Sequence, residues 1–143
     1  MCLMLYMATE YQIPRFCTVN VTIQEVPPER QIVRQWFSLS AIAVVGAHTG
    51  CGCGFPSVLA EHPVEYYEGM FDDSGDREKD LASARELLTL IGQTLASSKM
   101  LEFFPVWAGD EAEAPDGVIE MSVSEMKAET FFVNEHYLHR IRP

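Results

Sequence analysis

Two cysteines and a histidine, grouped in one short glycine-rich stretch, are the side chains of this sequence best suited to chemistry. The stretch GAHTGCGCGFP, residues 46–56, contains His48, Cys51 and Cys53. Cysteine sulfur and histidine nitrogen are ligands that zinc commonly takes in proteins. The neighbouring glycines permit positive φ, so the backbone could wrap closely around a small ion. The stretch therefore predicts a transition-metal site, with zinc as the expected ion.

A closed tetrahedral zinc site needs a fourth ligand, and Cys2 is the best candidate. Cys2 begins an apolar run, residues 2–8, which is typical of a buried strand. A similar run at 41–47 leads directly into the cysteines, so the two strands could be neighbours. The spacing argues against a structural zinc site. Zinc-binding cysteines are usually separated by about two to four residues, and only one residue separates Cys51 from Cys53.

Other interpretations of the cysteines stay open. Cys51 and Cys53 could form a strained, readily reduced disulfide, which would suit a thiol-redox protein. No Lys or Arg stands nearby to lower a thiol pKa, however. The cysteines could instead pack as small apolar side chains in a non-catalytic interaction module. A cysteine–histidine nucleophile lacks a third group at any recognised spacing. The sequence therefore assigns no catalytic residue and leaves open whether the chain is an enzyme.

The charge balance narrows the range of partners. Ten basic residues face 21 acidic ones, for a formal net charge of −11. Such a surface repels phosphate backbones and anionic lipids, so we expect neither nucleic-acid nor membrane binding. No apolar run approaches the ~20 residues of a membrane span, and the start of the chain lacks the basic segment of a signal peptide. We therefore expect a cytoplasmic protein with reduced thiols. Whether it binds a protein partner or a small ligand, or forms a homo-oligomer, stays open.

The elements that must position these side chains follow from the apolar pattern. Residues 76–98 carry apolar side chains at three- and four-residue steps, which predicts one long helix with a buried face. Strands are predicted at 2–8, 17–24, 41–47 and 101–107, a strand or short helix at 118–126, and a strand or hairpin at 130–141. We therefore expect a single α+β domain over residues 1–143. Its mostly antiparallel sheet has about five strands and is covered by the one long helix.

Prolines refine two of these elements. Pro28 suits the first turn of a short helix, whose buried face would carry Ile32, Val33 and Trp36. Pro105 cannot donate to a strand ladder, so it indicates an edge strand or a bulge.

Two further polar groups have simpler explanations than function. His136 and His139 are three residues apart, which would suit a metal on a helix, but a strand points them to opposite sides. Asp110 and Glu111 follow Trp107 at an expected strand end, where a solvated loop accounts for them. We assign no function to either group.

Several of these residues also match a family pattern. The matching positions are Cys2, Leu5, Tyr6, Gly46, His48, residues 50–55, Trp107 and residues 109–111. The chain resembles a group of small bacterial proteins of unknown function that begin Met-Cys, carry Gly-Cys-Gly-Cys-Gly-Phe, and later have a Trp followed by Gly-Asp-Glu. The resemblance implies that the cysteine stretch belongs to a family pattern. It implies no activity.

Overall fold

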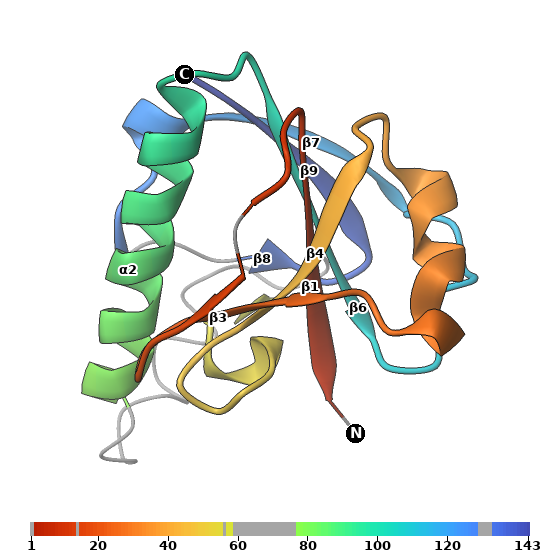
Figure 1. Cartoon of the computed structure of the whole chain (residues 1–143), viewed down its shortest axis with the longest axis horizontal. Coiled ribbons are helices and arrows are strands. Elements are labelled where there is room, and N and C mark those ends of the chain that lie inside the picture. The colour runs from red at the N-terminus through yellow and green to blue at the C-terminus, as the bar shows by residue number, and fades with distance from the viewer. Residues whose placement is uncertain (1, 14, 56, 59–76, 129–132) are drawn as a thin grey trace.

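A central sheet covered on both faces forms the body of the protein (Figure 1). The computed structural model describes residues 2–13, 15–55, 57–58, 77–128 and 133–143. Within these residues, seven strands form one sheet in the order β2-β3-β4-β1-β6-β9-β7. All neighbouring strands in it are antiparallel except β7 and β9. The predicted single α+β domain with a mostly antiparallel sheet and one long helix is confirmed.

The elements have the following bounds. The large sheet contains β1 Leu3–Thr9, β2 Phe16–Cys17, β3 Thr22–Glu25, β4 Ala41–Gly46, β6 Leu101–Trp107, β7 Gly117–Ser122 and β9 Tyr137–Arg142. A separate parallel pair contains β5 Ser57–Val58 and β8 Val133–Asn134. The long helix is α2 Arg77–Leu95, and the short 3-10 helices are η1 Pro28–Trp36, η2 Gly52–Gly54 and η3 Val123–Glu125.

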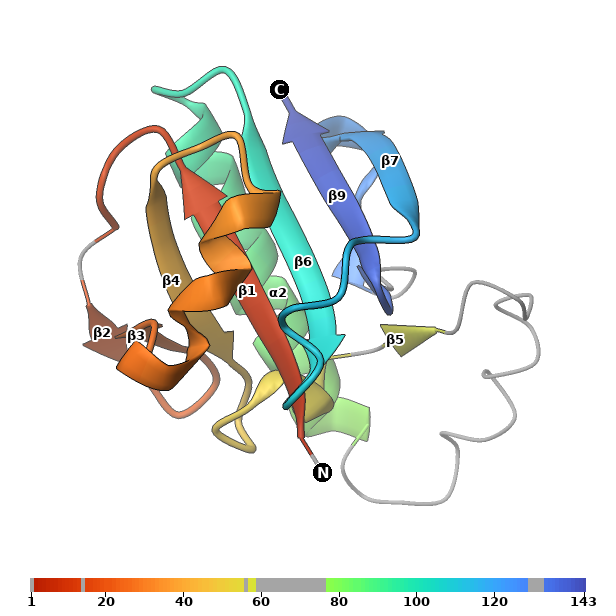
Figure 2. The ribbon, with the colours of Figure 1, turned by 90° about the vertical axis from the view of Figure 1, so that its right-hand side faces the viewer.

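The long helix covers one face of the sheet, as its apolar spacing predicted. Its buried side chains are Ala84, Leu87, Ile91 and Leu95. They pack in one core cluster with alternate residues of β1 and β6, among them Leu5, Met7 and Phe103. Figure 2 shows α2 behind the sheet and η1 in front of it. Because successive side chains of a strand point to opposite faces, β1 and β6 pack against α2 on one face and against η1 on the other.

The short helix η1 covers the other face, with a different buried side than the sequence indicated. Val33 is fully buried, and Trp36 packs partly buried against the same cluster as Tyr6 and Phe104. Ile32 is 50% exposed instead of sharing that face. A 3-10 helix has about three residues per turn, so positions three apart share a side. Arg30, not Ile32, joins the inward side.

Residues 17–24 form a tight hairpin instead of the single strand that their alternation predicted. Thr18 closes the turn: its backbone N–H donates to the carbonyl of Val21 over 2.9 Å, and its hydroxyl accepts from the N–H of Val21 over 3.0 Å. Val19 lies at the tip, 83% exposed, and leaves the buried face to Val21 and Ile23. The hairpin divides the expected strand into β2 and β3, which is one reason that the sheet exceeds the expected five or so strands.

Pro105 lies in an inner strand of the sheet instead of the edge strand that it could indicate. β6 is flanked by β1 and β9. The ladder to β9 ends at Phe103, opposite His139. Beyond that point the carbonyl of Pro105 accepts a hydrogen bond from the N–H of His136 over 2.8 Å. In an antiparallel strand the nitrogen and carbonyl of one residue point the same way, so the nitrogen of Pro105 also faces β9. The β6–β9 ladder has already ended there, so the missing N–H of proline breaks no ladder hydrogen bond.

One end of the sheet gathers the segments that carry the cysteines. β1 begins there, and β4 and β6, both antiparallel to β1, end there. Residues 47–55 follow β4, and residues 108–116 follow β6. We call this end, where β1 and β9 begin, the cysteine end of the sheet.

Candidate metal centre

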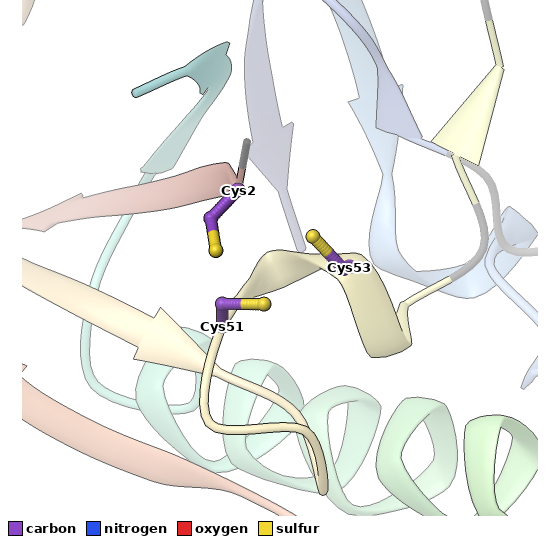
Figure 3. A group of neighbouring side chains, drawn as sticks. All are labelled: Cys2, Cys51 and Cys53. Carbon is purple, nitrogen blue, oxygen red and sulfur yellow. The ribbon is translucent and has the colours of Figure 1, made fainter. Parts of the chain in front are cut away.

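Three cysteine sulfurs converge at the cysteine end. The Sγ atoms of Cys2, Cys51 and Cys53 all lie within 4.8 Å of one another. Figure 3 shows the three side chains pointing toward a common space, Cys2 from the start of β1 and the other two from the turn after β4. Sulfurs that share one zinc ion, each at about 2.3 Å, lie about 3.8 Å apart in tetrahedral geometry. Small side-chain rotations therefore suffice to bring all three to one ion.

A compact turn presents Cys51 and Cys53. The backbone N–H of Ala47 donates to the carbonyl of Cys51 over 2.9 Å, and that of Gly50 donates to the carbonyl of Ala47 over 2.9 Å. Gly50 has φ +81°, a conformation that side-chain-bearing residues seldom adopt. The hydroxyl of Thr49 adds a bond to the carbonyl of Cys51 over 3.2 Å. These bonds fold the chain back on itself directly before the first thiol.

Gly52 allows the turn to lie against β1. A Cβ atom on Gly52 would lie 2.8 Å from the carbonyl oxygen of Leu3 and 3.2 Å from the nitrogen of Leu5. Only a glycine fits such a close approach of two backbones. The contact explains why the two cysteines are separated by glycine, and it places both of them beside the residue that follows Cys2.

Cys2 is held from its other side by the end of β6. The backbone N–H of Ala108 donates to the carbonyl of Cys2 over 2.9 Å. The next pair in register is Leu3 opposite Trp107. The backbone of Cys2 is thus anchored by β6, while the turn that carries Cys51 and Cys53 packs on β1.

The two thiols of the turn differ in how readily they ionise. Burial opposes ionisation of Cys51, but hydrogen bonds from the backbone and side chain of Cys53, and from the side chains of Thr49 and Cys2, outweigh it and hold the pKa of Cys51 below its ordinary value. Although Cys53 is exposed as a residue, partial burial of its sulfur raises the pKa of Cys53 to about 11; the bond from the N–H of Leu3 opposes this rise, and the Cys51 sulfur adds to it. Cys51 therefore ionises more readily than Cys53, and a bound cation would favour ionisation of Cys53.

His48 does not join the sulfurs. Its Nε2 lies 2.7 Å from Oδ1 of Asp80, and its backbone N–H donates to the hydroxyl of Ser83 over 3.1 Å. Both partners belong to the first turns of α2. The predicted ligand set of Cys51, Cys53, His48 and Cys2 is thus divided by the structure: three thiols come together, and the imidazole instead ties the turn to the helix.

The cysteines of the group are not core side chains. Cys2 and Cys53 are exposed and Cys51 is half-buried. This exposure argues against the interpretation in which the thiols only pack as small apolar groups. The fourth cysteine, Cys17, is also exposed but lies in β2, outside the group.

No family model, curated protein or solved structure matches the chain. The resemblance to small bacterial Met-Cys proteins stays a prediction. Among the described helices, none combines the length and apolar character needed to cross a bilayer. Fold and site together define a small α+β protein with a candidate three-cysteine metal centre.

Several contacts of the centre carry no sequence signal. The N–H of Leu3 donates to Sγ of Cys53 over 3.2 Å, and Thr49 Oγ1 lies 3.6 Å from Sγ of Cys51. A backbone N–H is present at nearly every position, so nothing marks this one in advance. The pairing of His48 with Asp80 depends on how α2 packs, which spacing along the chain does not reveal.

Proposed function

We propose that this protein binds a thiophilic transition-metal ion, zinc first among them, through Cys2, Cys51 and Cys53. The observation that carries the proposal is the convergence of three sulfur atoms within 4.8 Å. These sulfurs come from two segments nearly 50 residues apart, which the pairing of β1 with β4 brings together. Thiolates favour zinc, copper(I) and other soft or borderline ions over magnesium or calcium.

Three protein ligands leave one position of a tetrahedral ion open. Closed structural zinc sites usually have four protein ligands, whereas three ligands plus water or an exchangeable ligand are typical of reactive sites. Cys2 and Cys53 are exposed residues, so solvent can reach the ion at this end of the sheet. The geometry supports an ion that exchanges a ligand more readily than one sealed in the core.

Binding should also strengthen the fold. The ion would join the start of β1 to the turn after β4, which are otherwise linked here by the Leu3–Cys53 bond and the close approach at Gly52. A ligand that binds only the folded state stabilises it by about 2.7 kcal/mol at a free concentration of 100 times Kd. Zinc should therefore raise the melting temperature.

Equilibrium dialysis against zinc under reducing conditions tests the proposal. We expect one zinc ion per chain and a higher melting temperature, with both effects lost in Cys51→Ser. The matched control is Cys17→Ser, which removes an exposed thiol outside the group and should leave both effects unchanged. Equal zinc content in the two variants would reject the site.

A second candidate function, thiol–disulfide exchange, is favoured by the opposite pKa shifts of Cys51 and Cys53. The Cys51 thiolate would attack a low-molecular-weight disulfide such as oxidised glutathione, forming a mixed disulfide and releasing one thiolate. Cys53 would then lose its proton and attack the Cys51 sulfur, which releases the second thiolate. The protein dithiol is oxidised by two electrons as the small disulfide is reduced to two thiols.

Mass spectrometry after incubation in glutathione buffers distinguishes this chemistry from metal binding. An exchange pair gives a Cys51–Cys53 disulfide in the intact protein and a stable glutathione adduct in Cys53→Ser. A protein that binds zinc without exchanging thiols gives neither product while zinc is bound.

A further inference from the structure

A second group of side chains with metal-ligating atoms lies at the cysteine end of the sheet, and it contains no sulfur. One oxygen each of Asp110 and Glu113 and one ring nitrogen of His136 lie within 4.8 Å of one another. Asp110 and Glu113 follow β6, and His136 directly precedes β9. Two segments more than 20 residues apart in the sequence thus converge on one small volume. None of these three residues contributes to the three-cysteine centre.

The two carboxylates stand on a loop that the protein fixes from inside. Glu111, 5% exposed, accepts hydrogen bonds from the hydroxyl of Tyr6 over 2.9 Å and from the backbone N–H of Gly109 over 2.8 Å. It also pairs with the guanidinium of Arg30. Glu111 is therefore buried, whereas Asp110 is half-buried and Glu113 is exposed on the same loop. The loop backbone therefore needs little further ordering when the two carboxylates bind an ion.

The histidine is fixed as firmly. The backbone N–H of His136 donates to the carbonyl of Pro105 over 2.8 Å, and its carbonyl accepts from the N–H of Asp116 over 2.8 Å. His136 also has φ +63°, whereas every other residue with positive φ in the described part of the chain is a glycine. From this fixed backbone the imidazole lies near the loop after β6, with its Nε2 4.0 Å from Oδ2 of Asp110.

The spacing within the group fits an ion better than a direct pair. Nε2 of His136 and Oδ2 of Asp110 are 4.0 Å apart, beyond the reach of a hydrogen bond. Two ligands on one ion, each at about 2.1 Å, lie roughly 3 Å apart when adjacent and 4.2 Å apart when opposite. The carboxylates of Asp110 and Glu113 also repel each other, and a cation between them removes that repulsion.

We propose that Asp110, Glu113 and His136 form a second cation site, for a divalent first-row metal bound through two carboxylate oxygens and one imidazole nitrogen. Water fills the remaining positions. Oxygen and nitrogen donors without thiolate suit Mn²⁺ or Fe²⁺, whereas zinc and softer ions prefer the three cysteines. The two sites differ in donor chemistry, so neither proposal depends on the other.

Manganese titration followed by electron paramagnetic resonance of the free ion tests this site. The protein is the full chain with Cys2, Cys51 and Cys53 replaced by serine, which removes the thiol centre and separates the outcome from that of the proposed zinc function. We expect one saturable Mn²⁺ per chain. His136→Gly, which tolerates the positive φ, should weaken binding at least about tenfold.

Two further variants keep the test decisive. Glu113→Gln alters an exposed side chain, so it should fold normally and also weaken Mn²⁺ binding at least about tenfold. Glu125→Gln removes an exposed carboxylate outside the group and should leave the affinity unchanged. Circular dichroism checks that each variant folds. Two results would overturn the proposal: Mn²⁺ binding that does not saturate, or an affinity that Glu125→Gln weakens as much as Glu113→Gln does. Either result would show that Mn²⁺ associates non-specifically with surface carboxylates.

Discussion

The backbone N–H of Leu3 donates a hydrogen bond to the sulfur of Cys53 over 3.2 Å, across a separation of 50 residues. This bond joins the start of β1 to the turn after β4. It holds Cys53 next to Cys2, the residue that precedes β1. It also stabilises negative charge on that sulfur, since an N–H donor favours the thiolate. The arrangement of the thiols thus follows from how two backbones meet.

Gly52→Ala should disrupt the close backbone contact between the turn after β4 and β1. The new Cβ would lie 2.8 Å from the carbonyl oxygen of Leu3, and neither backbone can yield cheaply. We expect a loss of about 1–3 kcal/mol in the free energy of unfolding and a weaker affinity for zinc, because the turn must move away from Cys2.

Urea unfolding measures the first effect, and Gly92→Ala is its control. Gly92 lies inside α2 with open space around it, so alanine there should stabilise the protein by about 0.5–1 kcal/mol. If both substitutions stabilise, the close approach at Gly52 does not exist in solution.

Much of the fold that creates this contact could be predicted from the sequence. The apolar runs at 2–8 and 41–47 form strands that are neighbours, as the sequence allowed, and their antiparallel pairing brings Cys2 to Cys51 and Cys53. The helix predicted at 76–98 corresponds to α2. Continuous apolar runs and helical spacing are strong signals because a buried face requires them throughout an element.

The sequence does not predict local structure or side-chain partners where a single tertiary contact determines them. The turn at Thr18–Val21 is anchored by α2, since the amide of Asn20 donates to the carboxylate of Glu86 over 2.9 Å. His48 pairs with Asp80 on the same helix. The spacing of His136 and His139 likewise does not indicate that His136 lies before β9 with its Nε2 4.0 Å from Asp110. Such pairings depend on packing between distant elements, and alternation along one segment does not encode them.

His139 should make the stability of the protein depend on pH. The ring is 2% exposed; the N–H of Asn134 donates to its Nε2 over 3.1 Å, and its Nδ1 lies 3.0 Å from the carbonyl of Tyr137. Burial lowers the pKa of His139 to about 4, although hydrogen bonds to the backbone of Tyr137 and Phe103 oppose the shift. The folded state therefore resists a proton that the unfolded chain takes up near pH 6.5.

The sign of the effect follows from that difference. The unfolded chain binds more protons between about pH 4 and 6.5, so this contribution is fully present above pH 6.5 and is lost as the pH falls toward 4, by about 3 kcal/mol in total. Urea unfolding at several pH values should show the loss in the wild-type protein and a flatter profile in His139→Gln. Parallel profiles for the two proteins across this window would contradict the assignment.

Tyr6→Phe should destabilise the protein without disturbing the thiols. Tyr6 is fully buried and donates to Oε1 of Glu111 over 2.9 Å, a hydrogen bond to a charged group. Its loss should cost about 1.5–3 kcal/mol in the free energy of unfolding. Tyr11→Phe is the control, because Tyr11 is 66% exposed and should change stability by less than about 0.5 kcal/mol. Equal effects of the two substitutions would mean that the hydroxyl of Tyr6 is solvated.

Cobalt substitution tests the three-cysteine centre most directly, because sulfur-to-Co²⁺ charge-transfer absorption reports coordinated thiolates. We predict a charge-transfer band that saturates at one Co²⁺ per chain, falls stepwise in Cys2→Ser, Cys51→Ser and Cys53→Ser, and is unchanged in Cys17→Ser. A reduced wild-type protein that shows no such band with excess Co²⁺, or a band that survives replacement of all three cysteines, would contradict the account.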